Sequence, residues 1–121
     1  MIKNAHVMVI DDNEDILFML KAMLGMKGYK VSLKDSTDNL EKSILSLSPD
    51  IILMDMLLSG SDGREICKTL KSNKALSHIP IVMISAHPQA KETCTNAGAD
   101  YFLSKPFEIS DLFQTIQRAL T

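Results

Sequence analysis

The chain has 121 residues, a net charge of -2, 45% hydrophobic residues and 23% charged residues. This length and composition predict a single globular domain and argue against a disordered chain, a polycationic nucleic-acid-binding surface and a membrane span of about 20 apolar residues. The first ten residues lack the long apolar core and cleavage site of a signal peptide. We therefore expect a cytoplasmic protein that contacts neither nucleic acid nor membrane directly.

Short apolar runs alternate with apolar residues at helical spacing along the whole chain. Strands are predicted at 6–10, 29–34, 51–54, 81–84 and 101–103, and the alternating pattern of 29–34 suits a strand near a sheet edge. Helices are predicted at 16–24 with an end near Gly28, at 40–47, around 66–70, at 89–97, and from Ser110 as N-cap to Leu120. The chain thus repeats a strand–helix unit five times.

Five such units predict an α/β fold. The continuous apolar central strands indicate a parallel sheet that is covered by helices on both faces. Right-handed crossovers then favour a doubly wound sheet, in which ligands bind outside the carboxyl ends of the strands.

Polar side chains follow four of the predicted strands. They are Asp11 and Asp12 after the first, Asp55 after the third, Ser85 after the fourth and Lys105 after the fifth. Singly, an aspartate after a strand is usually a helix cap, and a lysine is usually a solvated charge. A parallel sheet brings all five to one edge, so together they predict a functional site.

Three crowded carboxylates favour Mg²⁺, for which Mn²⁺ is able to substitute, bound together with water and phosphate oxygens. Asp55, on the expected middle strand, is the candidate nucleophile that would form an aspartyl phosphate, while Lys105 neutralises phosphoryl charge. A proton shared between Asp11 and Asp12 is the alternative way to relieve their repulsion.

Four segments carry a resemblance to a known family: VMVIDDNED, IILMDMLLSGSDG, IVMISAH and GADYFLSKPF. Together they resemble the CheY-like receiver domain of two-component response regulators. The resemblance implies a flavodoxin-like (βα)5 sandwich with strand order 2-1-3-4-5. It also implies that residues 1–121 form a single receiver domain, with no output domain in this chain.

By this resemblance the protein is a phosphorylation-activated switch, not a turnover enzyme. A sensor histidine kinase or a histidine phosphotransfer protein would donate the phosphoryl group from a phosphohistidine to Asp55. The metal would be held by Asp55, directly by Asp12, through water by Asp11 and by the backbone carbonyl of Leu57.

The resemblance also assigns the parts of the switch. Ser85 matches the switch hydroxyl, Phe102 the switch aromatic, and Lys105 the phosphate-contacting lysine, with a cis bond to Pro106. Their movement would change the surface of the fourth helix, fifth strand and fifth helix. A phosphorylation-dependent homodimer would be compatible with this, and the downstream effector is not identified by the sequence.

Some positions depart from the family pattern. Ser59 stands where proline is frequent, so the loop is expected to be looser, while Gly60 and Gly63 keep its turns. Phe102 stands where tyrosine is frequent, and Tyr101 would point to the opposite side of a regular strand. These changes leave the phosphorylation chemistry intact.

Other residues are assigned simpler roles. Cys67 and Cys94 are expected to be reduced structural thiols, and the methionines, among them Met19, Met23, Met26 and Met54, are expected to fill the core. Histidines are expected to be structural or exposed, and His87, two residues after Ser85, is hypothesised to tune dephosphorylation.

Three other functions fit parts of the pattern. A magnesium-dependent phosphatase of the haloacid dehalogenase type would use an aspartyl phosphate, but such enzymes usually carry DxD after the first strand. A flavodoxin-like cofactor binder would meet an acidic first loop that repels the flavin phosphate. A degenerate receiver would act only as an interaction module, which the complete set of five site residues argues against.

Overall fold

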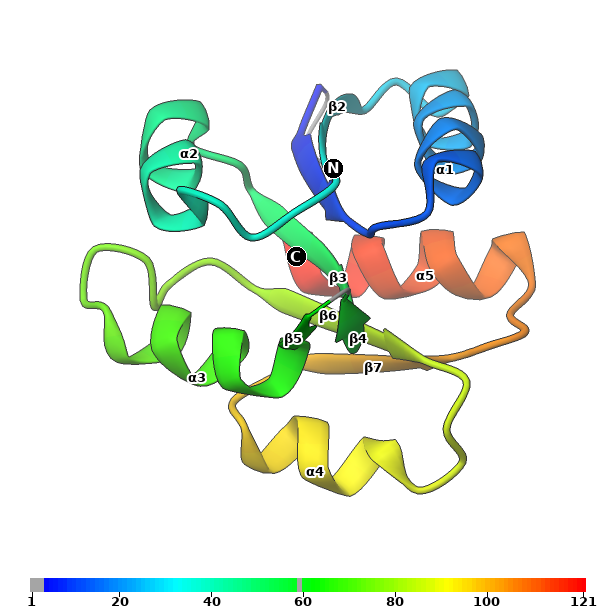
Figure 1. Ribbon diagram of the computed structural model, residues 1–121. Coiled ribbons are helices and arrows are strands. Elements are labelled where there is room, and N and C mark those ends of the chain that lie inside the picture. The colour runs from blue at the N-terminus through cyan, green and yellow to red at the C-terminus, as the bar shows by residue number, and fades with distance from the viewer. Residues whose placement is uncertain (1–3, 59) are drawn as a thin grey trace.

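The computed structural model describes residues 4–58 and 60–121. A five-stranded parallel sheet of order β2-β1-β3-β6-β7 lies at its centre (Figure 1). The strands are β1 (His6–Ile10), β2 (Lys30–Lys34), β3 (Ile51–Asp55), β6 (Ile81–Ser85) and β7 (Tyr101–Ser104). Because β6 and β7 are the fourth and fifth strands of this sheet, the predicted order 2-1-3-4-5 is confirmed.

Helices cover both faces of the sheet. They are α1 (Glu14–Met26), α2 (Leu40–Leu47), α3 (Gly63–Ser72), α4 (Ala90–Asn96) and α5 (Ile109–Leu120). Figure 1 shows α1 and α5 on one face and α2, α3 and α4 on the other. Within the described residues, none of the helices is long and apolar enough to cross a membrane.

The two faces bury alternate residues of the same strands, as the pleat of a strand requires. Met8 and Ile10 of β1 pack on the side of α2, α3 and α4, whereas Val7 and Val9 pack on the side of α1 and α5. All four side chains are buried. The continuous apolar run of β1 is therefore explained by a strand that is covered on both faces.

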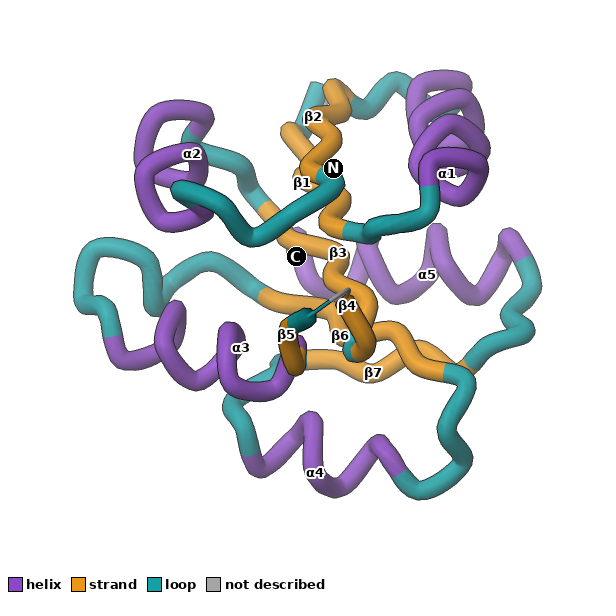
Figure 2. The backbone as a smooth tube through the Cα atoms, in the orientation of Figure 1, coloured by secondary structure: helices purple, strands orange, loops and turns teal. Residues whose placement is uncertain are grey.

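A short hairpin follows β3 and was not predicted from the sequence. It consists of β4 (Leu57–Leu58) and β5 (Ser61–Asp62), which pair in antiparallel fashion directly before α3 (Figure 2). Gly60 has a φ of +75°, a conformation that glycine adopts without a steric cost. The prediction for Ser59 falls outside the described residues.

The start of the last helix was predicted wrongly. Its N-cap is Glu108, and Ser110 lies inside the helix. The reason is a capping box, in which the Glu108 N–H donates to the Asp111 carboxylate at 3.2 Å while the Glu108 side chain bonds to the backbone of Asp111. This reciprocal pair caps the helix two residues earlier than the serine would.

The methionine prediction was partly wrong. Met54 is buried and Met23 is half-buried, but Met19 is 46% exposed and Met26 is 88% exposed. Both exposed methionines lie on α1, which is apolar around most of its circumference, so the helical spacing alone could not identify the buried side. Cys67 and Cys94 are buried and free, as predicted.

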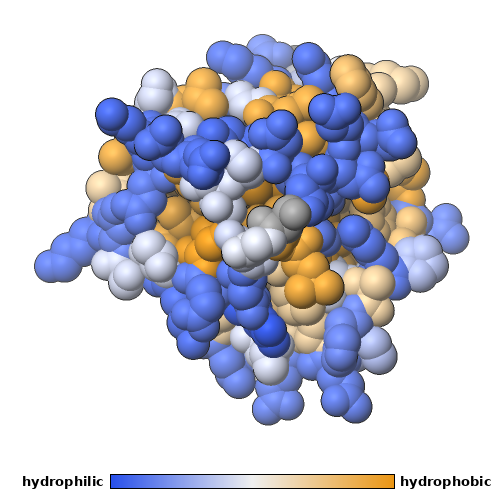
Figure 3. All heavy atoms as spheres, in the orientation of Figure 1, coloured by the Kyte–Doolittle hydropathy of each residue, from blue (hydrophilic) through white to orange (hydrophobic). Residues whose placement is uncertain are grey.

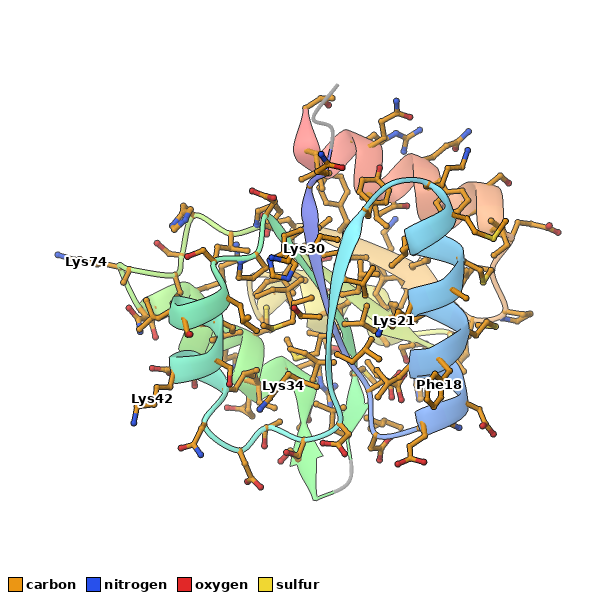
Figure 4. The ribbon with its side chains drawn as sticks, turned by 90° about the horizontal axis from the view of Figure 1, so that it is seen from above. Phe18, Lys21, Lys30, Lys34, Lys42 and Lys74 are labelled. Carbon is orange, nitrogen blue, oxygen red and sulfur yellow. The ribbon has the colours of Figure 1, made fainter. Side chains whose placement is uncertain are left out.

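The β2 edge of the sheet carries lysines. Figure 4 shows Lys30 and Lys34 on this edge, between Lys42 on α2 and Lys21 on α1. Lysines on an edge strand discourage pairing with a strand of another chain. Their arrangement is thus explained by protection of the edge.

Candidate functional site

The structure brings the predicted site residues to one edge of the sheet. Asp55 and Ser85 are the last residues of β3 and β6, and Lys105 follows β7 directly. The parallel register places Asp55 opposite Ile84 and Ser85 opposite Ser104. This common register is what converts four distant segments into one site.

Three carboxylates form the centre of the site. One oxygen from each of Asp11, Asp12 and Asp55 lies within 4.8 Å of the others. Asp11 is buried, Asp55 is half-buried and Asp12 is exposed. Oxygen ligands from two or three carboxylates suit a hard divalent cation such as Mg²⁺, so the donor set fits the predicted metal.

Asn13, and not an aspartate, caps α1. Its side-chain oxygen accepts from the N–H groups of Asp15 at 3.0 Å and Ile16 at 3.2 Å. The Asp11 carboxylate accepts from the Asn13 N–H at 2.9 Å, which fixes its orientation. Asp11 and Asp12 are therefore not the N-cap of α1. The sequence DDNED alone did not show which of its residues is the cap.

The ionised form of Asp11 is destabilised by its surroundings. Burial raises the pKa of its carboxyl above the ordinary value, the Asn13 N–H opposes this shift, and the negative charge of Asp55 adds to it. Such a group costs stability when ionised, and a bound cation would remove that cost.

Lys105 contacts the candidate nucleophile. Its ammonium group lies 3.1 Å from Asp55 Oδ1, and its backbone N–H donates to the Ser85 carbonyl at 2.9 Å. The Lys105–Pro106 bond is cis, as predicted. The lysine is thereby fixed to the strand that carries Ser85.

The switch candidates lie beside these groups. Ser85 is buried, and its Oγ accepts from the His87 N–H at 3.0 Å. Phe102 is half-buried against the core on the side of α2, α3 and α4, whereas Tyr101 packs on the side of α1 and α5. The predicted opposite orientation of the two rings is confirmed.

The histidines have the simpler environments that were predicted. His6 is buried, with Nε2 at 2.6 Å from Ser32 Oγ, and His78 is exposed. His87 is exposed next to Ser85, and its Nδ1 accepts from the Gln89 N–H at 3.2 Å. The position of His87 borders the site without closing it.

The backbone after Asp55 is tightly held. The Met56 N–H donates to the Ile84 carbonyl at 2.8 Å, and the Gly63 N–H donates to the Met56 carbonyl at 2.7 Å. Leu57, whose carbonyl is the fourth predicted metal ligand, lies in β4 and is 64% exposed. The loop is therefore anchored at its start and at its end.

An apolar groove of about 560 Å³ adjoins the site and was not predicted. Asp11, Asp55 and Lys105 line it at the site, and residues of α1 and of the β7–α5 connection, including Met19 and Phe107, line the rest. Hydrophilic side chains cover most of the face drawn in Figure 3, and hydrophobic atoms show between them at the centre of this face and on both of its sides, including the side of α1 and α5.

Comparison with known proteins identifies relatives along the whole chain. The sequence model of the response regulator receiver domain matches residues 7–117. The response regulator PleD of Caulobacter vibrioides is 36% identical over 121 residues, covering 98% of this chain and 26% of that protein. The transcriptional regulator RpaA of Synechocystis is 29% identical over 119 residues, covering 95% of this chain. This chain spans about half the length of RpaA (48%) and about a quarter of the length of PleD (26%).

Solved structures give the same relationship. A response regulator from Chloroflexus aurantiacus has a TM-score of 0.91 and 30% identity, with 98% of each chain covered. The receiver domain of a sensor histidine kinase from Pseudomonas aeruginosa, with a magnesium ion coordinated in its active site cleft, has a TM-score of 0.87 and 27% identity, covering 97% of this chain and 98% of that chain.

Proposed function

The chain belongs to the response regulator receiver family, and from this premise we propose that it is a switch in which Asp55 accepts a phosphoryl group. The donor is a phosphohistidine of a sensor histidine kinase or of a histidine phosphotransfer protein in the cytoplasm. The observation that carries this proposal is the convergence of Asp11, Asp12 and Asp55 within 4.8 Å, with Lys105 3.1 Å from Asp55.

The reaction transfers one phosphoryl group. A carboxylate oxygen of Asp55 forms a bond to phosphorus while the bond between phosphorus and the donor's imidazole nitrogen breaks, and the imidazole keeps the electron pair and takes up a proton. Receiver domains act as switches, so the product is the phosphorylated protein itself and no separate substrate is turned over.

The remaining site residues orient the phosphoryl group and neutralise its negative charge. Asp12, Asp55, the Leu57 carbonyl and, through water, Asp11 would hold Mg²⁺ or Mn²⁺. The bound ion would supply positive charge to the phosphoryl oxygens. Lys105, already fixed at 3.1 Å from Asp55, supplies a further positive charge.

Movement of Ser85 couples phosphorylation of Asp55 to the surface of the protein. When its hydroxyl donates to a phosphoryl oxygen, Ser85 moves toward Asp55, and the space it vacates accommodates Phe102. The surface of α4, β7 and α5 then changes, which shifts a pre-existing equilibrium between two conformations.

The apolar groove provides the donor with an approach to Asp55. A donor imidazole must reach the acceptor oxygen, and the groove walls of α1 and the β7–α5 connection flank that path. An apolar helix of the donor protein would bury these exposed side chains as it docks.

Intact mass measurement tests the proposal. The protein is incubated with a small phosphoryl donor such as acetyl phosphate, with magnesium and with chelator in parallel. We expect a gain of one phosphoryl group in the magnesium sample of the wild type and none in Asp55→Asn, because the amide is a poor nucleophile. Asp38→Asn, which alters an exposed carboxylate, serves as the matched control and should be phosphorylated normally.

The outcome against the proposal is equally clear. A folded wild type that gains no phosphoryl group from acetyl phosphate, phosphoramidate or a phosphohistidine protein would favour a receiver that acts only as an interaction module. Phosphorylation that persists in Asp55→Asn would move the acceptor to another residue.

His87 gives a finer test of the same site. Its backbone N–H donates to the switch hydroxyl at 3.0 Å and its ring is exposed, so a ring at this position can control the access of attacking water to the phosphoryl group. We expect His87→Ala to change the decay rate of the phosphoprotein without changing the site of phosphorylation. Equal decay of the two phosphoproteins would dispose of this role.

A further inference from the structure

The Arg64 guanidinium is fixed at the start of α3, next to the acceptor loop. Its Nε donates to Asp62 Oδ1 at 2.9 Å, and its Nη2 donates to Asp62 Oδ2 at 2.7 Å. The same carboxylate accepts from the Arg64 backbone N–H at 2.9 Å and so caps α3. A two-pronged pair of this kind sets the direction of the guanidinium as well as its position.

The remaining nitrogen of this guanidinium reaches across to α4. Arg64 Nη1 donates to Thr93 Oγ1 at 3.2 Å, and Thr93 Oγ1 donates in turn to the Ala90 carbonyl at 3.1 Å. Within residues 4–58 and 60–121, no other side-chain hydrogen bond or ion pair joins α4 to another element.

α4 is held otherwise by small side chains. The helix has seven residues, and its buried members are Ala90 and Cys94. Such short side chains bury little apolar surface, so the solvent-exposed bond to Arg64 adds to a small set of contacts that position this helix.

The other end of the connection is attached to the phosphoacceptor. A Cβ on Gly63 would lie 2.7 Å from the Asp55 carbonyl oxygen and 3.0 Å from that of Met56, so the two backbones are in direct contact. The hairpin also pairs Leu57 with Asp62. Asp62 and Arg64 therefore cannot move independently of the backbone at residues 55–57.

We infer that Arg64 is a positioning residue that transmits a change in the acceptor loop to α4 through Thr93. This inference rests on the proposed function and adds a second connection beside the one through Ser85. When residues 55–57 shift on phosphorylation, the guanidinium moves with Asp62, and the bond to Thr93 displaces α4 with it.

Amide resonances measured with magnesium and beryllofluoride, which mimics a phosphoryl group on aspartate, test this transmission. We expect the mimic to shift the amides of residues 55–57 equally in the wild type, Thr93→Val and Thr93→Ser. The shifts of residues 90–96 should fall to about half in Thr93→Val, because one of two connections is lost. They should remain at the wild-type level in Thr93→Ser, which keeps the hydroxyl. Arg64→Lys, which keeps the charge but not the fork, should resemble Thr93→Val.

Two outcomes overturn the inference. Normal shifts at 55–57 with unreduced shifts at 90–96 in Thr93→Val would show that the contact is structural and that Ser85 alone reaches α4. A reduction of the same size in Thr93→Ser would show that the hydroxyl is not the connection. By contrast, a wild type without shifts at 55–57 and without a gain in mass would contradict the proposed function itself, and the inference would fail with it.

Discussion

The central sheet has two edges formed by strand ends, an amino edge where the parallel strands begin and a carboxyl edge where they end. These two edges hold similar polar groups in different ways. At the amino edge, the Asp100 carboxylate accepts from Lys71 Nζ at 2.7 Å and from the Ile81 N–H at 2.8 Å, and Asp50 accepts from the His6 N–H at 2.7 Å. At the carboxyl edge, three carboxylates crowd within 4.8 Å of one another. The charged groups at the amino edge stabilise the folded state, whereas the crowded carboxylates at the carboxyl edge destabilise it.

The difference separates polar groups that stabilise the fold from polar groups that are available to bind a cation. Lys71 also donates to the carbonyls of Ser77 at 3.2 Å and Ile79 at 2.9 Å, so one ammonium group joins the end of α3 to the starts of β6 and β7. Burial and neighbouring charge raise the pKa of Asp11 at the other edge. A crowded edge of this kind becomes favourable when a cation binds.

Gly63→Ala should have the largest effect on stability. Its Cβ would lie 2.7 Å from the Asp55 carbonyl oxygen, and a backbone contact cannot be relieved by rotating a side chain. We expect a loss of about 3 kcal/mol in the free energy of unfolding together with slower phosphorylation, because the acceptor loop must shift. Urea unfolding and the rate of phosphorylation by acetyl phosphate measure the two effects.

Gly25→Ala is the matched control within the same chain. Gly25 lies in α1, and beyond its chain neighbours and the adjacent backbone of its own helix no atom would lie within 4 Å of its added Cβ. The substitution should therefore stabilise the protein by about 0.5–1 kcal/mol through the helix propensity of alanine and leave phosphorylation unchanged. If Gly63→Ala behaved like Gly25→Ala, the close contact beneath the acceptor would be unimportant.

Lys71→Met should have the next largest effect, and it separates the two edges. The variant loses three contacts of one partly buried ammonium group, so we expect a loss of about 2 kcal/mol in the free energy of unfolding. The magnesium-dependent phosphorylation rate should match the wild type at a temperature where both are folded. A lowered rate would mean that the amino edge contributes to the site.

Much of the fold could be predicted from the sequence, because its main signals are local. The apolar run of β1 is buried on both faces and reads as a strand without further information. The site followed from topology, since parallel strands bring Asp11, Asp55 and Ser85 to the same edge wherever they lie in the chain. Their residue types then indicated the chemistry.

The unpredicted features depend on specific contacts, one of them local to a helix turn and the others tertiary. Glu108 caps α5 through a reciprocal bond with Asp111, although Ser110 has the better intrinsic preference. Met26 is exposed because burial depends on which side of an apolar helix faces the sheet. The bond from Arg64 to Thr93 spans 29 positions, and no periodicity reports such a pair.

Asp11→Asn should have a smaller effect than Lys71→Met, and its sign distinguishes the two edges most directly. The asparagine oxygen can still accept from the Asn13 N–H while the buried charge is removed, so we expect metal-free protein at neutral pH to gain about 1 kcal/mol in the free energy of unfolding. With magnesium the order should reverse, because the wild type binds the cation more tightly and gains more stability from it.

The pH dependence of stability in the wild type and Asp11→Asn shows independently whether the Asp11 charge stabilises or destabilises the folded state. The folded-state pKa of Asp11 is raised above the ordinary value of 3.8, so this carboxyl favours the folded state below that value and loses its contribution as the pH rises through the folded-state pKa. The metal-free wild type should therefore lose stability relative to Asp11→Asn as the pH rises from about 4 toward neutrality, the other carboxyls being common to both proteins. Urea unfolding in chelator at several pH values measures the difference, with Asp38→Asn as the exposed control. Parallel profiles for the wild type and Asp11→Asn would mean that the charge of Asp11 is already balanced within the protein, as the charges of the amino edge are.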